Sequence, residues 1–478
     1  MNRIFFFFLG FLLANSLGAQ GYSIKVKLVN YDQDTLLLGY YYGNKQYLTD
    51  TATQKNGSFY FSDQEPLQAG MYMIVMPPDN NFFQLLVNED EQKLEIETDA
   101  KEPVPNFKIK KSKDNQVYYA YLNYLDKKRV ERENLEKEKV EAGADEKLLE
   151  EIQLKLTELD KSVIDEQEKI IRENPKTFTA NLLKSNRRID VPEFEGSPEE
   201  IGQKRYLFYK HHYFDHIDLK DPRLLRSQTL FPRFEYYVEK LTPQVPDSII
   251  QSIDYLLQSV EEVEDTYHFF LSHFLNKYAA SKFVGMDAVY VHMVEKYYNQ
   301  GKAPWVDEEQ LAKMTKNAKT LKSILIGKIA PDLKMKKQDK TFLSLHEVDS
   351  KYTVLFFWDP ECGHCKKSIP KIIEFYDKYK SKGVEIFSIC TVLGEKANNC
   401  WKTVEEKEMG KWINVNDPYL RSRFKQIYDV RTTPRIFILG EDKEILSKGI
   451  GAEQLGGMMD FLLEREAKEM KMQDQGKK

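Results

Sequence analysis

The chain has 478 residues, which allows about three domains of ordinary size. Its formal net charge of −5 is small for this length, so no overall basic bias points to nucleic acid as a partner. Charged residues make up 30% and hydrophobic residues 41% of the chain, which suits soluble domains with a substantial helical share.

The first residues have the pattern of a secretory signal peptide. Arg3 supplies a positive charge, an apolar run covers 4–13, and small residues follow up to Ala19. A run of this length is too short to span a bilayer, which requires about twenty apolar residues. We therefore expect 1–19 to be cleaved and the protein to be exported to the periplasm or cell envelope, with no transmembrane segment afterwards. An uncleaved membrane anchor is the alternative.

The residues 22–110 have the pattern of a β-rich domain. Apolar and polar side chains alternate in SIKVKLV (23–29), and further short apolar runs follow at close intervals. Asn56-Gly57 is a strong signal for a hairpin turn. Many short strands with turns between them predict a β-sandwich-like domain or a barrel.

The residues 114–325 are predicted to form an all-α domain that begins with a charged helical hairpin over 114–173. The segment 142–144 (AGA) separates the two helices, and Asp145 is a good N-cap for the second helix. Apolar residues of the second helix recur at steps of three and four, as in a coiled-coil seam of about two heptads: Leu149, Ile152, Leu156, Leu159 and Val163. Because two heptads are few, we expect the hairpin to pack against its own neighbours, and a dimerisation arm is the alternative.

Histidines cluster in this helical domain. His212 and His216 are four residues apart, which on a helix would suit a metal ion, and His211 precedes them. Aromatic residues surround them: Tyr206, Phe208, Tyr209, Tyr213 and Phe214. An aromatic packing face is therefore the favoured interpretation, and His268 and His273 have similar surroundings. We expect no metal and no cofactor.

The residues 326–470 alternate between strand and helix patterns, after a linker at 327–332 (GKIAPD). The run TVLFFW (353–358) is continuously apolar, as in a strand that is buried on both faces. An amphipathic helix (366–380) and a second apolar strand (384–391) follow, and this order predicts a βαβ unit with parallel strands. The remaining predicted elements are helices near 396–409 and 418–427, a hairpin of strands at 435–440 and 444–451, and a closing helix.

Cys362 and Cys365 lie where the first of these strands meets the helix, separated by Gly363 and His364. At a helix N-terminus, unpaired N–H groups and the helix dipole stabilise a thiolate, which is the attacking species in disulfide exchange. We therefore predict a redox-active disulfide in which Cys362 is the nucleophile and Cys365 the resolving thiol. His364 would further stabilise the thiolate and make the couple more oxidising.

Other kinds of cysteine site fit this pair less well. A zinc site needs further ligands, and Cys390 and Cys400 have an unlike spacing. A structural disulfide does not need the strand-to-helix junction. A peroxide-reducing cysteine would have Thr or Ser where Asp359 stands and Pro where Leu355 stands. For Cys390 and Cys400 themselves, two inert cysteines are the favoured interpretation and a second disulfide is the alternative.

The segment WDPECGHCKKSIPKI (358–372) resembles the active-site segment of the thioredoxin superfamily, most of all that of exported TlpA/ResA-type thiol–disulfide oxidoreductases. Trp358 matches the aromatic residue of the family. VRTTPRIFIL (430–439) resembles the cis-proline loop, so Pro434 is the cis-proline candidate and Thr433 would offer backbone contacts to the substrate. The resemblance implies a thioredoxin fold for the C-terminal domain. The Cys-Gly-His-Cys tetrapeptide matches that of protein disulfide isomerases.

The chain departs from the family at two positions that assist proton transfer. Phe356 stands where thioredoxins have a buried acid, and Ser368 stands where ResA-type reductases have a glutamate. His364, Glu361 or Asp359 are candidates to replace these acids. Upstream, HYFDHIDLKDPRLLR (212–226) and GMDAVYVHMVEKYY (285–298) resemble a helical domain of unknown function, which in exported bacterial proteins follows a β-rich domain of unknown function.

Taken together, these residues predict a periplasmic thiol–disulfide oxidoreductase that acts on protein substrates. The resemblance implies a reductase fed by a membrane electron donor, and this direction is slightly favoured, whereas the tetrapeptide implies a more oxidising, isomerase-like couple. The alternative is a binding or assembly protein of the cell envelope, in which the upstream domains act and the thioredoxin domain is accessory.

Overall fold

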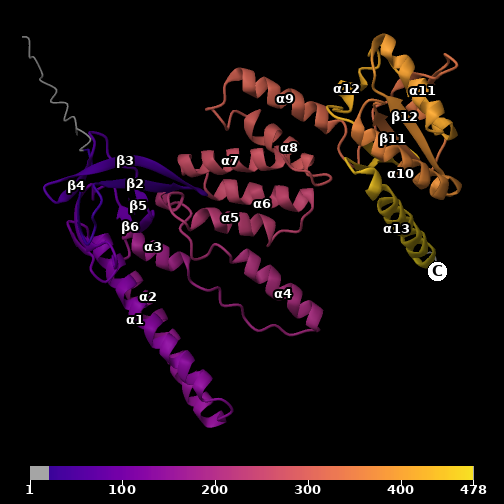
Figure 1. The fold of residues 1–478 in the computed structure, drawn as a ribbon. Helices are drawn as coiled ribbons and strands as arrows, with labels where there is room; N and C mark the ends of the chain where they lie inside the picture. The colour runs from indigo at the N-terminus through magenta and orange to yellow at the C-terminus, as the bar shows by residue number, and fades with distance from the viewer. Residues whose placement is uncertain (1–20, 477–478) are drawn as a thin grey trace, which may run out of the picture. The chain divides into compact units, whose positions relative to one another are not determined.

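The computed structural model describes residues 21–476, so the predicted signal peptide lies outside the described residues. The chain divides into two compact units. One comprises the described residues up to Leu241 together with Leu256–Phe269, and the other comprises Thr242–Tyr255 together with the residues from Phe270 onward. Along the chain, strands come first, a helical middle follows, and an α/β part ends the described residues (Figure 1).

The first unit begins with an eight-stranded sheet formed by described residues, in the order β6-β5-β2-β3-β4-β1-β7-β8. Its strands are β1 (Ser23–Val29), β2 (Thr35–Tyr42), β3 (Lys45–Lys55), β4 (Ser58–Ser62), β5 (Gly70–Met76), β6 (Asn81–Val87), β7 (Lys93–Asp99) and β8 (Lys108–Lys110). Val26, Leu38 and Leu85 come from distant strands of this order and share one core. The sheet therefore folds over itself, in keeping with a sandwich-like domain.

The predicted hairpin turn is confirmed between β3 and β4. Asn56 and Gly57 both have positive φ angles, 52° and 75°. Such a pair suits a tight two-residue hairpin, since its backbone twist matches the twist of the strands that it joins.

The charged hairpin is also confirmed, as α1 (Lys113–Glu141) and α2 (Glu146–Glu173). Asp145 caps α2, because its carboxylate accepts the backbone N–H of Leu148 at 3.1 Å. The core between the two helices consists of Leu135, Ile152, Leu156 and Leu159. The apolar residues of α2 thus pack against the partner helix of the same hairpin.

Two helices of the middle part begin at signals that can be read in the sequence. Ser197 and Glu200 form a capping box around Pro198, the first residue of α4, and Pro246 is the first residue of α6. The helices are α3 (Phe178–Ser185), α4 (Pro198–His211), η1 (Pro222–Leu224), α5 (Leu230–Glu239), α6 (Pro246–Ser259), α7 (Glu264–Ala279), α8 (Asp287–Met293), η2 (Val294–Tyr298) and α9 (Glu308–Lys322).

A seven-stranded sheet of described residues organises the α/β part, in the order β10-β9-β13-β12-β11-β14-β15. Its strands are β9 (Lys334–Lys336), β10 (Phe342–Ser344), β11 (Tyr352–Trp358), β12 (Val384–Cys390), β13 (Ile413–Asn416), β14 (Arg435–Leu439) and β15 (Ile445–Lys448). The helices are η3 (Leu345–Glu347), α10 (Gly363–Tyr379), η4 (Lys380–Lys382), η5 (Gly394–Ala397), α11 (Asn398–Glu406), η6 (Met409–Lys411), α12 (Phe424–Ile427), η7 (Ala452–Gln454) and α13 (Leu455–Gly476). As predicted, β11 and β12 are parallel.

Strand β11 lies inside this sheet and is buried on both faces. Val354 and Phe356 enter one core together with residues of α10 and α13, and Leu355 and Phe357 enter a second core on the opposite face. The continuous apolar run of the sequence is explained by these two cores. The carboxyl ends of β11 and β12 lie side by side, which is where open α/β sheets place their functional sites.

Three details differ from the prediction. The segment 327–332 is not a free linker, since the N–H of Gly327 donates to Ile445 at 2.9 Å and the N–H of Ala330 donates to Lys443 at 2.9 Å. The helix expected near 418–427 is reduced to α12, and β13 was not predicted. The predicted fold class is confirmed: an N-terminal β-sheet domain, a helical middle and a C-terminal thioredoxin-like α/β sheet.

Candidate active site

Cys362 stands between the buried strand β11 and helix α10. It is the N-cap of α10, and its sulfur accepts the backbone N–H of Cys365 at 3.4 Å. Asp359 closes the turn before it: its carbonyl accepts the N–H of Cys362 at 3.2 Å, and its carboxylate accepts the N–H of Glu361 at 2.8 Å. The junction therefore directs N–H groups of the first helical turn at the Cys362 sulfur.

The two thiols of this site differ in exposure. Both are free, so the structure shows the dithiol form. Cys362 is partly exposed, whereas Cys365 is 0% exposed and belongs to the core that also contains Trp358 and Ile369. Another protein can therefore reach the sulfur of Cys362 but not that of Cys365.

Burial opposes the ionisation of Cys362, but hydrogen bonds outweigh burial and lower its pKa. They come from the Thr433 side chain, from the backbone and side chain of Cys365, and from the backbone of His364. A lowered pKa increases the fraction of thiolate near neutral pH, which favours attack on a disulfide.

Cys365 has the opposite character, because burial raises its pKa to about 12. The backbone of Asp359 and the side chain of Thr433 lower this pKa, and the neighbouring Cys362 raises it. Cys365 therefore holds its proton near neutral pH and has to lose it before it can attack.

The loop at Thr433 and Pro434 lies directly against this site. The bond between these two residues is cis. The thiol of Cys362 donates to the carbonyl oxygen of Thr433 at 3.2 Å, although the two residues are 71 positions apart in the chain. The fold thus brings together the two motifs that the sequence presents separately.

The remaining predicted residues are distributed around the two sulfurs. Trp358 ends β11 and is 1% exposed, whereas Gly363 and His364 are exposed in the first turn of α10. Phe356, at the position of the thioredoxin acid, is buried among apolar side chains. Ser368, at the position of the ResA glutamate, is partly exposed on α10.

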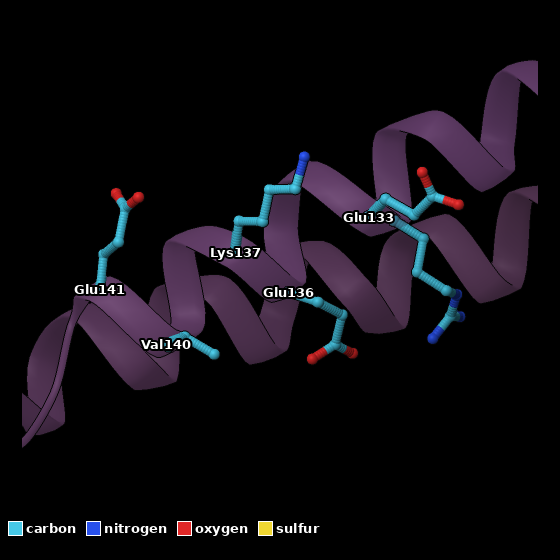
Figure 2. A pocket seen from close by; sticks show the side chains of 6 residues that line it. Glu133, Glu136, Lys137, Val140 and Glu141 are labelled. Carbon is cyan, nitrogen blue, oxygen red and sulfur yellow. The ribbon is translucent and has the colours of Figure 1, made fainter.

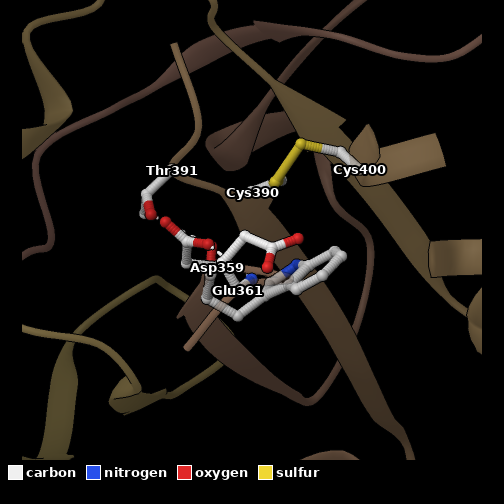
Figure 3. Close-up of a disulfide and its surroundings, with 6 residues drawn as sticks. Asp359, Glu361, Cys390, Thr391 and Cys400 are labelled. Carbon is white, nitrogen blue, oxygen red and sulfur yellow. Dashed lines mark hydrogen bonds between the residues drawn. A yellow bond between two sulfur atoms is a disulfide. The ribbon is translucent and has the colours of Figure 1, made fainter. Parts of the chain in front are cut away.

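Cys390 and Cys400 form a disulfide, so their interpretation as two inert cysteines is wrong. Cys390 ends β12 and Cys400 lies in the first turn of α11, and the fold brings their Cα atoms to 6.1 Å, within the range of disulfides. Figure 3 shows this disulfide close to Thr391 and to Asp359 and Glu361 of the turn before Cys362. The spacing of the two cysteines carries no signal for this pair, because only the fold brings them together.

In the histidine cluster, His212 contacts a carboxylate and an aromatic ring. The Nδ1 atom of His212 lies 2.6 Å from the Asp215 carboxylate, and its ring centroid is 4.1 Å from that of Phe208. Within residues 21–476, no group of three or more His, Cys, Asp or Glu side chains is arranged to hold a metal ion. None of the helices in that range has the length and hydropathy of a membrane span.

A hollow along the last turns of α1 is lined by Arg132, Glu133, Glu136, Lys137, Val140 and Glu141. Figure 2 shows that these side chains point in different directions from the helix and do not converge on a centre. Val140 is 82% exposed, and the charges have both signs. This hollow therefore lacks the convergent polar groups of a binding site.

Three regions of the chain match known protein families. The Redoxin family matches residues 325–460, and two domains of unknown function, DUF4369 and DUF5106, match 22–118 and 161–323. The thiol-disulfide oxidoreductase ResA of Bacillus thuringiensis subsp. konkukian is 38% identical over 140 residues, which are 29% of this chain and 76% of that protein. The ResA of Oceanobacillus iheyensis is 34% identical over 143 residues, which are 28% of this chain and 71% of that protein.

Among solved structures, a domain of a possible thiol-disulfide isomerase from Cytophaga hutchinsonii is 36% identical and covers 31% of this chain and 97% of that chain, with a TM-score of 0.28. The chain is an oxidoreductase and belongs to the TlpA/ResA-like thiol–disulfide oxidoreductases of the thioredoxin superfamily, with additional N-terminal domains.

Proposed function

We propose that this protein exchanges disulfides with protein substrates through Cys362 and Cys365. The observation that carries the proposal is the contrast between the two sulfurs. Cys362 is accessible at the N-cap of α10 and has a lowered pKa, whereas Cys365 is buried with a pKa of about 12. Such a pair has one sulfur suited to attack and one suited to resolve the product of that attack.

The reaction proceeds in two exchanges. The Cys362 thiolate attacks one sulfur of a substrate disulfide, a mixed disulfide forms, and the other substrate sulfur leaves as a thiolate. Cys365 then loses its proton and attacks the Cys362 sulfur, which releases the second substrate thiolate and forms the Cys362–Cys365 disulfide. The substrate gains two electrons, and a thiol donor has to return two electrons to the protein.

The groups around the sulfurs have supporting roles in this proposal. Thr433 and Pro434 form the surface on which the substrate chain docks, because the Thr433 carbonyl lies 3.2 Å from the Cys362 sulfur. A side chain at Gly363 would meet no atom within 4 Å, so this position lies in open space, and the N–H of His364 stabilises the thiolate. Trp358 fixes the start of the turn by its burial.

We propose reduction of substrate disulfides as the direction. Stabilisation of a thiolate favours the reduced form and makes a couple more oxidising. Here only the Cys362 thiolate is stabilised, since burial disfavours the Cys365 thiolate. The shift towards an oxidising couple therefore comes from Cys362 alone, and the resemblance of 358–372 to the active-site segment of ResA-type reductases supports the reducing direction.

We propose that the protein acts outside the cytosol, in the periplasm or cell envelope. The predicted signal peptide (1–19) supports this location, and so does the disulfide between Cys390 and Cys400, because disulfides persist in oxidising compartments. A reductase in such a compartment needs electrons from a membrane donor protein. Fractionation of cells that express the full chain should find the mature protein, without 1–19, in the envelope fraction.

The domain limits in this proposal are 22–110, 114–325 and 326–470. The first two domains would select or position the protein substrate, and the third carries the chemistry. Turbidity of insulin reduced by dithiothreitol tests the chemistry in the full chain. We expect the wild type to accelerate insulin reduction and Cys362→Ser to abolish this acceleration, with Cys390–Cys400 intact in both. A wild type without effect would contradict the proposal and favour a binding or assembly role.

A further inference from the structure

The Cys390–Cys400 disulfide lies in the same core as the resolving thiol. Cys390 is 2% exposed and Cys400 is 1% exposed, and both belong to the apolar cluster that contains Cys365 and Trp358. Disulfide exchange requires access of the attacking thiol. The burial of this disulfide therefore separates it from soluble thiols and makes it a lasting cross-link in the wall of the site.

Thr391, which follows Cys390 in the chain, is hydrogen-bonded to Trp358, the last residue before the active-site turn. In the parallel ladder, Cys390 is the register partner of Trp358. Thr391 then donates twice to the carbonyl oxygen of Trp358, from its backbone N–H at 2.8 Å and from its hydroxyl at 3.1 Å. Thr391 is only 5% exposed, so water does not compete for these hydrogen bonds.

The same peptide group reaches the resolving sulfur. The carbonyl of Trp358 and the N–H of Asp359 belong to one planar unit, so the orientation of one fixes that of the other. The backbone of Asp359 lowers the pKa of Cys365 and so favours the thiolate of the resolving cysteine, which shares its core with Trp358. Thr391 therefore fixes the orientation of the Trp358 carbonyl, and through the planar peptide group it also fixes the direction of the Asp359 N–H.

We propose that the Cys390–Cys400 disulfide is a positioning element for the resolving step, which holds Thr391 so that the Trp358–Asp359 peptide directs its N–H at the Cys365 sulfur. The inference rests on the proposed function, and it adds the second cysteine pair to the machinery of the first. It concerns the second exchange, because the donors that lower the pKa of Cys362 come from α10 and from Thr433.

The expected effect follows from the chemistry of the resolving thiol. For each unit by which the pKa of Cys365 rises, its thiolate fraction near neutral pH falls tenfold. The nucleophilicity of the thiolate rises with its pKa and offsets about half of this loss, which leaves a resolving step about threefold to fourfold slower. The attack by Cys362 should keep its rate.

The test uses 5,5′-dithiobis-(2-nitrobenzoate), whose two halves leave one after the other. Attack by Cys362 on this disulfide releases the first coloured thiolate, and attack by Cys365 on the mixed disulfide releases the second. We would follow both phases by stopped flow with the reduced full chain. The variants are Cys390→Ala/Cys400→Ala, Thr391→Val and a control on the same helix as Cys400, Val404→Ala, whose side chain is 6% exposed in the same core.

We expect the alanine pair to slow the second phase at least threefold and to leave the first phase within twofold of the wild type. Thr391→Val should slow the second phase by less, because the backbone N–H of Thr391 still donates, and Val404→Ala should change neither phase. An unchanged second phase in the folded alanine pair, or equal slowing by Val404→Ala, would overturn the inference. If the alanine pair does not fold, an unchanged second phase in Thr391→Val overturns it. A wild type that releases no coloured thiolate would instead refute the proposed function.

Discussion

Loss of the Cys390–Cys400 disulfide should destabilise the α/β part of the chain by an amount that the structure specifies. The disulfide closes a loop with a sequence separation of 10. In the chain-entropy relation, a loop of this length loses about 9 cal/mol/K in the unfolded state, or about 2.7 kcal/mol at 25 °C. Replacing both buried cysteines by alanine also leaves two small cavities, each of which costs about 1 kcal/mol.

Unfolding in urea, followed by tryptophan fluorescence, measures these quantities. Trp358, Trp401 and Trp412 all lie in the α/β part and report on it. Reductant should lower the free energy of unfolding of the wild type by about 2.7 kcal/mol. Cys390→Ala/Cys400→Ala should lower it by about 4 to 5 kcal/mol and should not respond further to reductant.

A control variant isolates the contribution of the second pair. Cys362→Ser/Cys365→Ser retains the Cys390–Cys400 disulfide, so its stability should respond to reductant as that of the wild type does. A response below about 1 kcal/mol in this variant would refute the reasoning, because loop closure alone predicts more than twice that value.

Three further predictions concern single groups. Cys365→Ser should accumulate a mixed disulfide with substrate through Cys362, visible by non-reducing electrophoresis. The rate of alkylation of Cys362 by iodoacetamide should rise with pH around a midpoint below the usual thiol pKa of about 8.5. The lowered pKa also stabilises the reduced protein, and this contribution should be present above the unfolded pKa and lost as the pH falls through the folded pKa. Burial raises the pKa of Asp254, but side-chain hydrogen bonds from His292, Lys296 and Tyr297 outweigh the effect of burial and lower this pKa to about 2. Urea unfolding at pH 7 should show that Asp254→Asn lowers the free energy of unfolding by about 2 kcal/mol. In the wild type, this contribution should be present above the unfolded pKa of about 4 and lost as the pH falls through the folded pKa of about 2.

The α/β part was largely predictable from local pattern. The run at 353–358 is continuously apolar because β11 has a core on each face, and such a run is typical of a strand that is buried on both faces. The position of Cys362 at the start of α10 followed from the junction of strand and helix. The roles of Cys362 and Cys365 in the reaction stay predictions, whereas the family and the oxidoreductase class are confirmed by the relatives.

The features that were missed depend on contacts that spacing does not encode. Cys390 and Cys400 meet only because the chain turns back between β12 and α11, so their separation in sequence did not reveal the pair. β13 has the sequence INVN, too short and too polar for a strand signal, and it forms because β12 offers a parallel edge. Likewise, the parallel pairing of β1 with β7 joins the two ends of the N-terminal domain and leaves no local pattern.

The reduction potential of the Cys362–Cys365 pair tests the central claim most directly. It can be measured in the full chain by equilibration in graded glutathione or dithiothreitol buffers, with alkylation of free thiols as the readout. The account predicts a reversible two-electron couple near or below about −250 mV, close to thioredoxin. A couple at about −180 mV or higher would contradict the reductase direction, and the absence of any reversible couple in the wild type would contradict the exchange chemistry itself.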